Sequence, residues 1–205
     1  MLRIGWEPPE VPEYDPEVHN PEKVFAFLCY RGVYYAKWVY LNIIIEGSSW
    51  NLNNPRKMIR DLVKSDDSIL HHKIKPCGVN CDRHFVSKTL IENMFHHEGC
   101  GLSANQIGMD TRAFAMIRDI EYNDVIVCFN PVILKTYGEF VNCEEGCLSF
   151  PDKFINVIRQ DIIDVKYEDE EGKEHKITLQ GLSSRIFQHE LDHLFGFLYV
   201  DRLNS

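Results

Sequence analysis

The chain has 205 residues, of which 44% are hydrophobic and 26% are charged, and its formal net charge is −9. This composition is typical of one globular domain that buries its own core. The acidic balance argues against a nucleic-acid partner, because binding phosphates requires an excess of Lys and Arg. No apolar run approaches the roughly 20 residues of a membrane-spanning helix, which argues against a membrane protein. The seven cysteines are odd in number and no signal peptide precedes them, so we expect a reduced, cytoplasmic protein.

Residues 1–57 differ in composition from the rest of the chain. Residues 1–22 contain five prolines and six acidic residues, and we expect them to form an extended arm. Aromatic residues crowd into 24–50, and all three tryptophans precede residue 51. Because so much aromatic surface needs a packing partner, we expect this N-terminal extension to pack on a domain formed by residues 58–205.

The first predicted helix begins after Asp82, a favourable N-cap, and ends before Gly99. Between them, apolar residues recur at spacings of three and four, which indicates an amphipathic helix. Four short segments with strand character follow, and Glu171-Gly172 is a plausible turn between the last two. These segments are 113–117, 125–129, 162–167 and 175–179. Since helices and strands do not alternate as in a parallel sheet, the sequence predicts the α+β class.

A second helix is predicted near the end of the chain. Ser183 or Ser184 is a suitable N-cap, the helix runs to about Leu194, and Gly196 follows as a C-terminal cap. Apolar residues on it, Ile186 among them, indicate that one face is buried.

This second helix contains the pattern His-Glu-x-x-His at His189, Glu190 and His193. Residues four apart lie about 6 Å from each other on one helical face, so both imidazoles can reach one metal ion at about 2.0–2.1 Å. Glu190 lies beside them and can take a proton from water. The alternative is that two histidines coincide on a helix without a metal, since the pattern is short.

A catalytic metal needs a third protein ligand. One class of zinc peptidase has a histidine six residues after the second histidine of the motif, but Tyr199 stands at that position. The best upstream candidate is Cys147, because a thiolate is a strong donor and the adjacent Gly146 lets the backbone approach the metal. The alternative is that Cys147 is a small core residue, as most free cysteines are.

A third motif, residues 99–106, places two glycines and several small residues directly after the first helix. Such a backbone lets another chain run close to it, and Gln106 offers an amide donor. The alternative is a helix-ending glycine followed by an ordinary turn.

Taken together, the motifs 99–106, 145–149 and 188–193 resemble peptide deformylase, and the likeness covers roughly residues 58–205. The resemblance implies an α+β fold with mixed or antiparallel strands around a central His-Glu-x-x-His helix, and another helix before the strands. It also implies a metal-dependent hydrolase that removes the formyl group from the N-terminal formyl-methionine of nascent polypeptides and releases formate.

The resemblance further implies roles for individual residues. The metal ligands would be Cys147, His189 and His193. The ion is commonly Fe²⁺ in the family, and Zn²⁺, Ni²⁺ and Co²⁺ suit the same donors. Glu190 would take a proton from the attacking water and deliver it to the departing amine. The Gln106 amide and the Leu148 backbone N–H would hold the oxyanion.

By the same resemblance, the methionine side chain enters an apolar pocket, and the peptide pairs like an added strand with the backbone of Cys100, Gly101 and Gly146. The pocket walls would include Cys100, Cys143, Leu182 and Ile186. Arg185 stands where the family usually has an aliphatic residue. We expect its stem to line the pocket and its charged head to reach solvent.

Two carboxylates near the motifs each allow two interpretations. Glu145 and Arg159 either form an ion pair that braces the cysteine loop or are unrelated surface charges. Asp192 either orients the imidazole of His193 or is solvated.

Other sites and functions stay open at this stage. Cys77 and Cys81, with His84 nearby, are either a second metal site or loop cysteines. A zinc metallopeptidase that uses the same helix and a non-catalytic, deformylase-like binding module are the alternatives to a deformylase.

The chain stops at Ser205, about where the C-terminal helix of the family would begin. Short forms without this helix occur among phage-encoded deformylases, so we expect a viral protein that works in the host cytoplasm. The helix docks bacterial members on the ribosome. The ribosome is therefore a candidate partner, but docking by this route is not expected.

Overall fold

The computed structural model describes residues 59–119 and 124–204. The predicted extension at residues 1–57, and its packing, lie outside the described residues. The elements, in chain order, are η1 (Ser68–Leu70), α2 (Arg83–His96), β1 (Gly101–Ser103), η2 (Ala104–Ile107), β2 (Ala113–Asp119), β3 (Asp124–Cys147), β4 (Phe150–Glu168), β5 (Glu174–Gln180), α3 (Leu182–Leu194) and η3 (Tyr199–Asn204).

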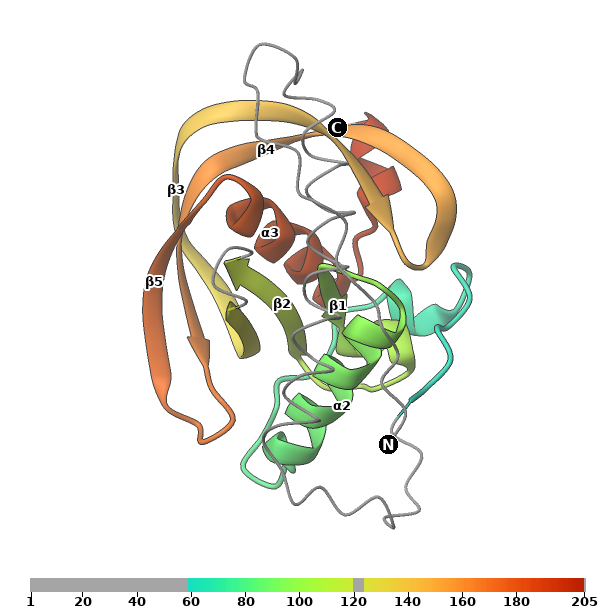
Figure 1. The fold of residues 1–205 in the computed structure, drawn as a ribbon, viewed down its shortest axis with the longest axis vertical. Coiled ribbons are helices and arrows are strands. Elements are labelled where there is room, and N and C mark those ends of the chain that lie inside the picture. Colours follow the sequence, from blue (N-terminus) through green and yellow to red (C-terminus); the bar gives the residue numbers. More distant parts are fainter. Residues whose placement is uncertain (1–58, 120–123, 205) are drawn as a thin grey trace, which may run out of the picture.

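The strands form one five-stranded antiparallel sheet in which each strand pairs with the next along the chain. The long strands β3 and β4, together with β5, curve around helix α3, while α2 lies beside β1 and β2 (Figure 1). The predicted α+β class is confirmed. Because the sheet wraps around α3, side chains from distant strands can converge on that helix.

The four predicted strand segments are confirmed as parts of β2, β3, β4 and β5, but β3 and β4 are much longer than predicted. β3 continues past residue 129 to Cys147, and β4 begins at Phe150 instead of residue 162. The pairing register between them shifts at four places. Each shift interrupts the alternation of apolar and polar residues by which a strand is predicted from sequence.

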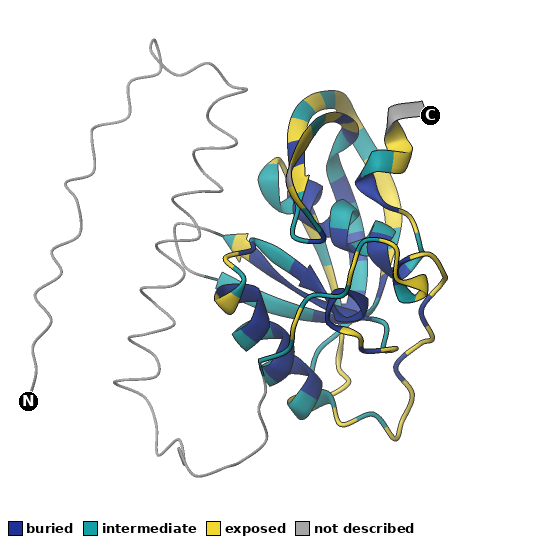
Figure 2. Ribbon diagram, turned by 90° about the vertical axis from the view of Figure 1, so that its right-hand side faces the viewer, coloured by how far each residue is buried: buried dark blue, intermediate teal, exposed yellow. Residues whose placement is uncertain are grey.

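Strand β2 divides the hydrophobic core into two parts. Residues 113–117 are all buried, and their side chains alternate between the two faces of the sheet. Ala113, Ala115 and Ile117 pack in one cluster with residues of α2, whereas Phe114 and Met116 pack in the other with residues of α3. Buried residues concentrate where the two helices meet the sheet (Figure 2). The two helices therefore have separate cores that share one strand.

Helix α2 matches its prediction closely. The Asp82 side chain accepts a hydrogen bond from the Phe85 N–H at 3.1 Å, as an N-cap does. After the helix ends, the Gly99 N–H donates to the Met94 carbonyl at 2.9 Å. This places residues 99–106 directly beyond the helix.

Helix α3 begins earlier than predicted. Gly181 is its N-cap, with φ of 62°, and no side chain caps the first turn. The two serines proposed as caps donate instead, Ser183 to the Gln180 carbonyl at 3.0 Å and Ser184 to the Gln160 carbonyl at 3.2 Å. The predicted position of Gly196 just after the C-terminal end of α3 is confirmed. Its φ is 80°, and an added Cβ there would lie 2.8 Å from the backbone of His71.

The predicted turn at Glu171-Gly172 is also confirmed. The Asp169 N–H donates to the Lys173 carbonyl at 3.0 Å, and Gly172 has φ of 80°. A glycine is favoured there because this conformation strains other residues.

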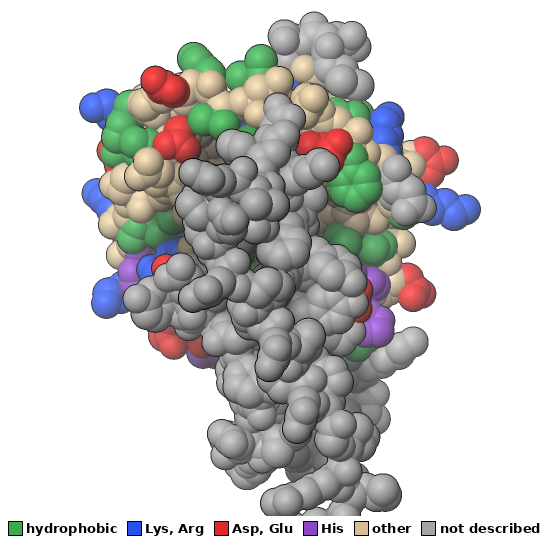
Figure 3. Space-filling view, turned by 45° about the horizontal axis from the view of Figure 1, so that its top comes forward, with side chains coloured by type: hydrophobic (Ala, Val, Ile, Leu, Met, Phe, Trp, Pro, Cys, Tyr) green, Lys and Arg blue, Asp and Glu red, His purple; other side chains and the backbone are tan. Residues whose placement is uncertain are grey.

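The described surface carries mixed side chains. On the face shown in Figure 3, apolar, acidic and basic side chains are interspersed. Within residues 59–119 and 124–204, no helix has the length and apolar character needed to cross a membrane.

Candidate metal centre and active site

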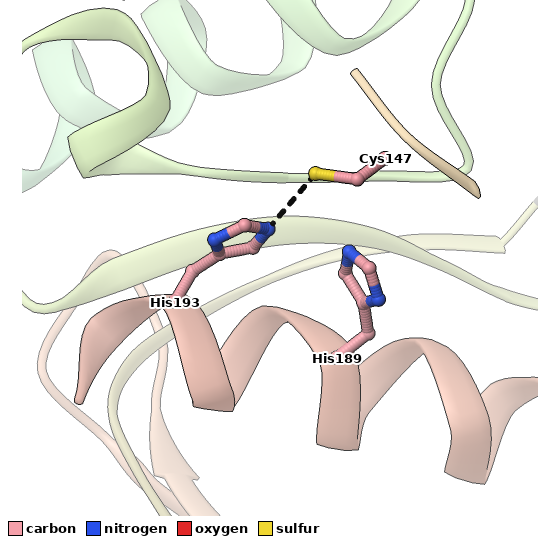
Figure 4. A group of neighbouring side chains, drawn as sticks. All are labelled: Cys147, His189 and His193. Atoms are coloured by element: carbon pink, nitrogen blue, oxygen red, sulfur yellow. Dashed lines mark hydrogen bonds between the residues drawn. The ribbon is translucent and has the colours of Figure 1, made fainter. Parts of the chain in front are cut away.

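Three of the predicted site residues converge at one point. Cys147 ends strand β3, and His189 and His193 lie one turn apart on α3 with their rings turned toward it (Figure 4). Their ligand atoms all lie within 4.8 Å of one another, and Cys147 Sγ is 3.3 Å from His193 Nε2. Among the described residues, no other group of three or more such side chains meets this spacing.

The predicted second site at Cys77 and Cys81 has no third ligand among the described residues. Burial and a hydrogen bond with Cys81 raise the pKa of Cys77 to about 12. Both findings favour the interpretation as loop cysteines, since a thiol must lose its proton to bind a metal.

The electrostatics at Cys147 favour the thiolate. Burial alone would raise its pKa, but the neighbouring imidazoles of His193 and His189 outweigh burial and hold the pKa well below its usual value. One thiolate and two imidazoles suit a divalent transition metal ion, and three protein ligands leave a coordination position for water or substrate. The residues present therefore fit the metal that the sequence motif implies.

Glu145 fixes the orientation of the His189 ring. Burial would raise the pKa of Glu145, but hydrogen bonds from His189 and Arg159 hold it far below its usual value. The ionised carboxylate can only accept, so His189 Nδ1 donates to Glu145 Oε2 at 3.0 Å. The other ring nitrogen is turned toward Cys147 (Figure 4), which is the orientation a metal ligand needs.

The predicted ion pair between Glu145 and Arg159 is confirmed and buried. Arg159 Nε lies 2.6 Å from Glu145 Oε1 and Arg159 Nη2 lies 2.9 Å from Oε2. Both residues are 3% exposed. The interpretation as unrelated surface charges is wrong.

Two other predictions about charged residues are wrong. Arg185 does not send its head to solvent: the residue is 6% exposed and Nη1 lies 2.6 Å from Glu145 Oε1. Asp192 does not orient His193. It accepts from Arg159 at 2.8 Å and from Arg202 at 2.8 and 2.6 Å, and the buried Nδ1 of His193 has no partner among the described residues. Both errors arise because the sequence does not show where a buried cation lies.

Glu190 lies beside the two imidazoles in a dry environment. It is 4% exposed, and burial raises its pKa although His189 and His193 act in the opposite direction. Its buried Oε2 has no hydrogen-bond partner among the described residues. A carboxylate in this state can accept a proton from a reacting group.

Gly101 makes room for Glu190, a function that the sequence analysis did not anticipate. A Cβ added to Gly101 would lie 2.5 Å from Glu190 Oε1. With any other residue at that position, the Glu190 side chain or strand β1 would have to shift. Gly146 has a similar constraint, since its added Cβ would lie 2.7 Å from the Phe154 ring.

Gln106 is held with its amide nitrogen toward the site. Its Oε1 accepts from the Ser103 N–H and hydroxyl, both at 2.9 Å. Its Nε2 lies 3.2 Å from Ser149 Oγ and 3.5 Å from Cys147 Sγ. Ser103 was not predicted as a site residue, although the spacing Ser-x-x-Gln is a known signature of reciprocal capping.

The remaining predicted site residues, which would hold the peptide or the oxyanion, lie on several different elements. Leu148 follows Cys147 in the turn before β4, and a Cβ added to Gly99 would lie 2.8 Å from its Cδ1. Leu182 and Ile186 of α3 pack in the α3 core, and Cys100 borders both cores. Cys143, on β3, is half-buried opposite Val157.

Comparisons with known proteins place the chain in a family. The family described as polypeptide deformylase matches residues 59–205. The peptide deformylase of Picosynechococcus sp. is 39% identical over 142 residues, which are 68% of this chain and 76% of that protein. The enzyme of Thermotoga sp. strain RQ2 is 40% identical over 141 residues, which are 67% of this chain and 83% of that protein.

Solved structures agree with these relatives. The peptide deformylase of Thermotoga maritima has a TM-score of 0.66 at 36% identity and covers 70% of this chain and 97% of its own. That of Synechococcus elongatus has a TM-score of 0.66 at 32% identity, with coverage of 74% and 83%. The fold, the match over residues 59–205 and the relatives agree that this chain belongs to the peptide deformylase family.

Proposed function

We propose that residues 58–205 form a catalytic domain in which Cys147, His189 and His193 bind one divalent metal ion and α3 is the central, metal-binding helix. Peptide deformylases remove the N-formyl group from nascent polypeptides and release formate, and membership of the family gives this chain the same reaction. The observation that carries the site assignment is the convergence of a thiolate and two imidazoles within 4.8 Å, beside the buried Glu190.

We propose Fe²⁺ as the native ion because it is common in the family, and the donor set suits Zn²⁺, Ni²⁺ and Co²⁺ equally well. A divalent cation held there polarises a carbonyl and makes water more acidic. Glu145 orients His189 for this purpose through the bond from Nδ1.

Glu190 moves the proton in the proposed reaction. One carboxylate oxygen accepts a proton from the water that attacks the formyl carbon, and then delivers it to the amine nitrogen as the carbon–nitrogen bond breaks. Its raised pKa supports this role, because the group must hold the proton between the two steps.

The oxyanion forms on the formyl oxygen. We propose that Gln106 Nε2 and the backbone N–H of Leu148 donate to it. The bonds from Ser103 hold the Gln106 side chain in place in advance, which limits the reorganisation needed when charge develops.

The peptide is proposed to lie along the backbone of Cys100, Gly101 and Gly146, with its methionine side chain near Cys143, Leu182 and Ile186. A peptide deformylase from Acinetobacter baumannii, with a TM-score of 0.65 and 30% identity, has been solved with Met-Ala-Ser bound, which supports a peptide of this kind as ligand. Formylated nascent chains are made in the cytoplasm, and we propose that compartment as the place of action.

The substitution Glu190→Gln tests the proposal. Formate release from formyl-Met-Ala-Ser should slow by about 10²- to 10⁴-fold, the usual contribution of a general base, while metal content stays at the wild-type level. Glu92→Gln on α2 is the matched control and should change neither quantity. Unchanged turnover in Glu190→Gln would refute the role of Glu190. Cleavage of unformylated Met-Ala-Ser by the wild-type chain would instead favour a zinc peptidase.

A further inference from the structure

One buried carboxylate is shared by two guanidinium groups and a metal-binding imidazole. Glu145 Oε1 accepts from Arg159 Nε and from Arg185 Nη1, both at 2.6 Å. Oε2 accepts from Arg159 Nη2 at 2.9 Å and from His189 Nδ1 at 3.0 Å. The exposed fractions of Glu145, Arg159 and Arg185 are 3%, 3% and 6%. Arg159 and Arg185 therefore hold the carboxylate that accepts the hydrogen bond from His189.

Arg185 also ties the helix to both long strands. Its Nη1 donates to the Val157 carbonyl on β4 at 3.0 Å, and its Nη2 donates to the Val141 carbonyl on β3 at 2.7 Å. Arg185 and His189 are four residues apart on α3 and lie on the same face. The guanidinium thus sets the position of this face relative to the strand that carries Glu145.

The two arginines are not equivalent. Arg159 is also bonded to Asp192, with Nη1 2.8 Å from Asp192 Oδ2, so its position depends on a second carboxylate. Arg185 is bonded to Glu145 and to two backbone carbonyls of the sheet, which move less than side chains. Arg185 therefore connects the Glu145 carboxylate to the backbone of both long strands, whereas Arg159 connects it to Asp192.

We propose that Arg185 is a positioning residue for His189: by bonding both the Glu145 carboxylate and the backbone of the β3–β4 hairpin, it holds that carboxylate, and through it the His189 ring, in the orientation that binds the metal ion. The inference rests on the proposed function, in which His189 is a metal ligand. An aliphatic residue at this position could pack there but could not donate to the carboxylate.

Arg185 influences a metal ion in two opposite ways. A nearby cation repels a divalent ion, so removing the charge would strengthen metal binding. An oriented imidazole binds better than a free one, so removing the anchor would weaken it. Arg185→Lys keeps the charge but loses the planar fork, and Arg185→Met loses both. The pair of variants therefore separates orientation from charge.

The experiment measures how fast the Co²⁺-loaded protein loses its metal ion to excess EDTA, from the decay of the visible absorption of bound Co²⁺. It also measures kcat and KM for formyl-Met-Ala-Ser. Arg112→Met is the control, because Arg112 donates to the Ile74 carbonyl outside this network. We expect both Arg185 variants to lose Co²⁺ about 10-fold faster than wild type or the control, or faster still. We also expect kcat to fall while KM changes little.

The proposal is overturned if Arg185→Lys holds Co²⁺ as long as wild type, if Arg185→Met holds it longer, or if both match Arg112→Met. Should Arg185→Met fail to fold, Arg185→Lys decides by the same criterion. A wild-type chain that binds Co²⁺ but releases no formate refutes the proposed reaction, while the rates of Co²⁺ loss still decide the role of Arg185.

Discussion

Helices α2 and α3 flank the same strand but satisfy their buried polar groups in different ways. On α2, the Thr89 hydroxyl donates to the Phe85 carbonyl and the Asn93 amide to the Thr89 carbonyl, both at 2.7 Å. These bonds run within one helix, to carbonyls four residues earlier. Thr89 and Asn93 can therefore be buried without a partner from the sheet.

On α3, the buried polar groups depend on distant strands. Arg185 bonds to carbonyls of β3 and β4, His193 faces Cys147 at the end of β3, and Glu190 lies against Gly101 of β1. Such groups are costly to bury unless their partners are in place. α2 is therefore mainly a packing element, whereas α3 keeps polar groups whose arrangement suits the proposed site.

The strongest test of this contrast is Cys147→Ala. It removes one of three proposed metal ligands, and two imidazoles alone do not form a catalytic site. We expect the metal content to fall close to zero and formate release to fall to that of the metal-free protein. Elemental analysis and formate release measure the two effects. Cys128→Ala is the control, since Cys128 is fully buried on β3 but outside the site; equal metal loss in both variants would contradict the assignment.

A smaller effect is expected for Gly101→Ala. The added methyl would lie 2.5 Å from Glu190 Oε1, so the carboxylate must move. A displacement of about 1 Å at a reacting group can cost about 10²-fold in rate, and we expect kcat to fall by that order with metal content unchanged. In Gly78→Ala, no heavy atom lies within 4 Å of the new Cβ. That variant should behave as wild type, and a wild-type kcat for Gly101→Ala would show that Glu190 tolerates displacement.

Local signals in the sequence predicted the local parts of the fold. The cap at Asp82, the spacing along α2 and the turn at Glu171-Gly172 each depend on residues close together in the chain, and all three are confirmed. The length of β3 and β4 was not predictable, because four register shifts hide the alternation that marks a strand. Gly181 is the N-cap of α3 in place of the predicted serine. The hydroxyls of Ser183 and Ser184 donate to carbonyls of Gln180 and Gln160 and do not cap the helix.

The candidate site divides in the same way. Cys147, His189 and His193 were predicted because short motifs contain them, and the structure brings them together. The burial of Arg185 and the partners of Asp192 were predicted wrongly. Both depend on how the β3–β4 hairpin and η3 lie against α3, and spacing along one helix does not contain that information. Gly101 was predicted as a backbone partner of the bound peptide. Its other role, leaving space for the Glu190 side chain, was not predicted because Glu190 is far along the chain.

The smallest expected effect on activity comes from paired core substitutions, one in each helix. Leu90 of α2 and Leu194 of α3 are both 0% exposed, so each change to alanine should destabilise the fold by about 2–5 kcal/mol through lost contacts and a cavity. Leu194 directly follows His193, and the cavity should let that imidazole shift, so we expect kcat to fall a few-fold. Leu90→Ala should leave kcat of the folded fraction unchanged. Chemical denaturation gives the stabilities, and formate release corrected for folded protein gives kcat. Equal losses of kcat in the two variants would mean that α2 supports the site as directly as α3, and the distinction between a packing helix and a site helix would fail.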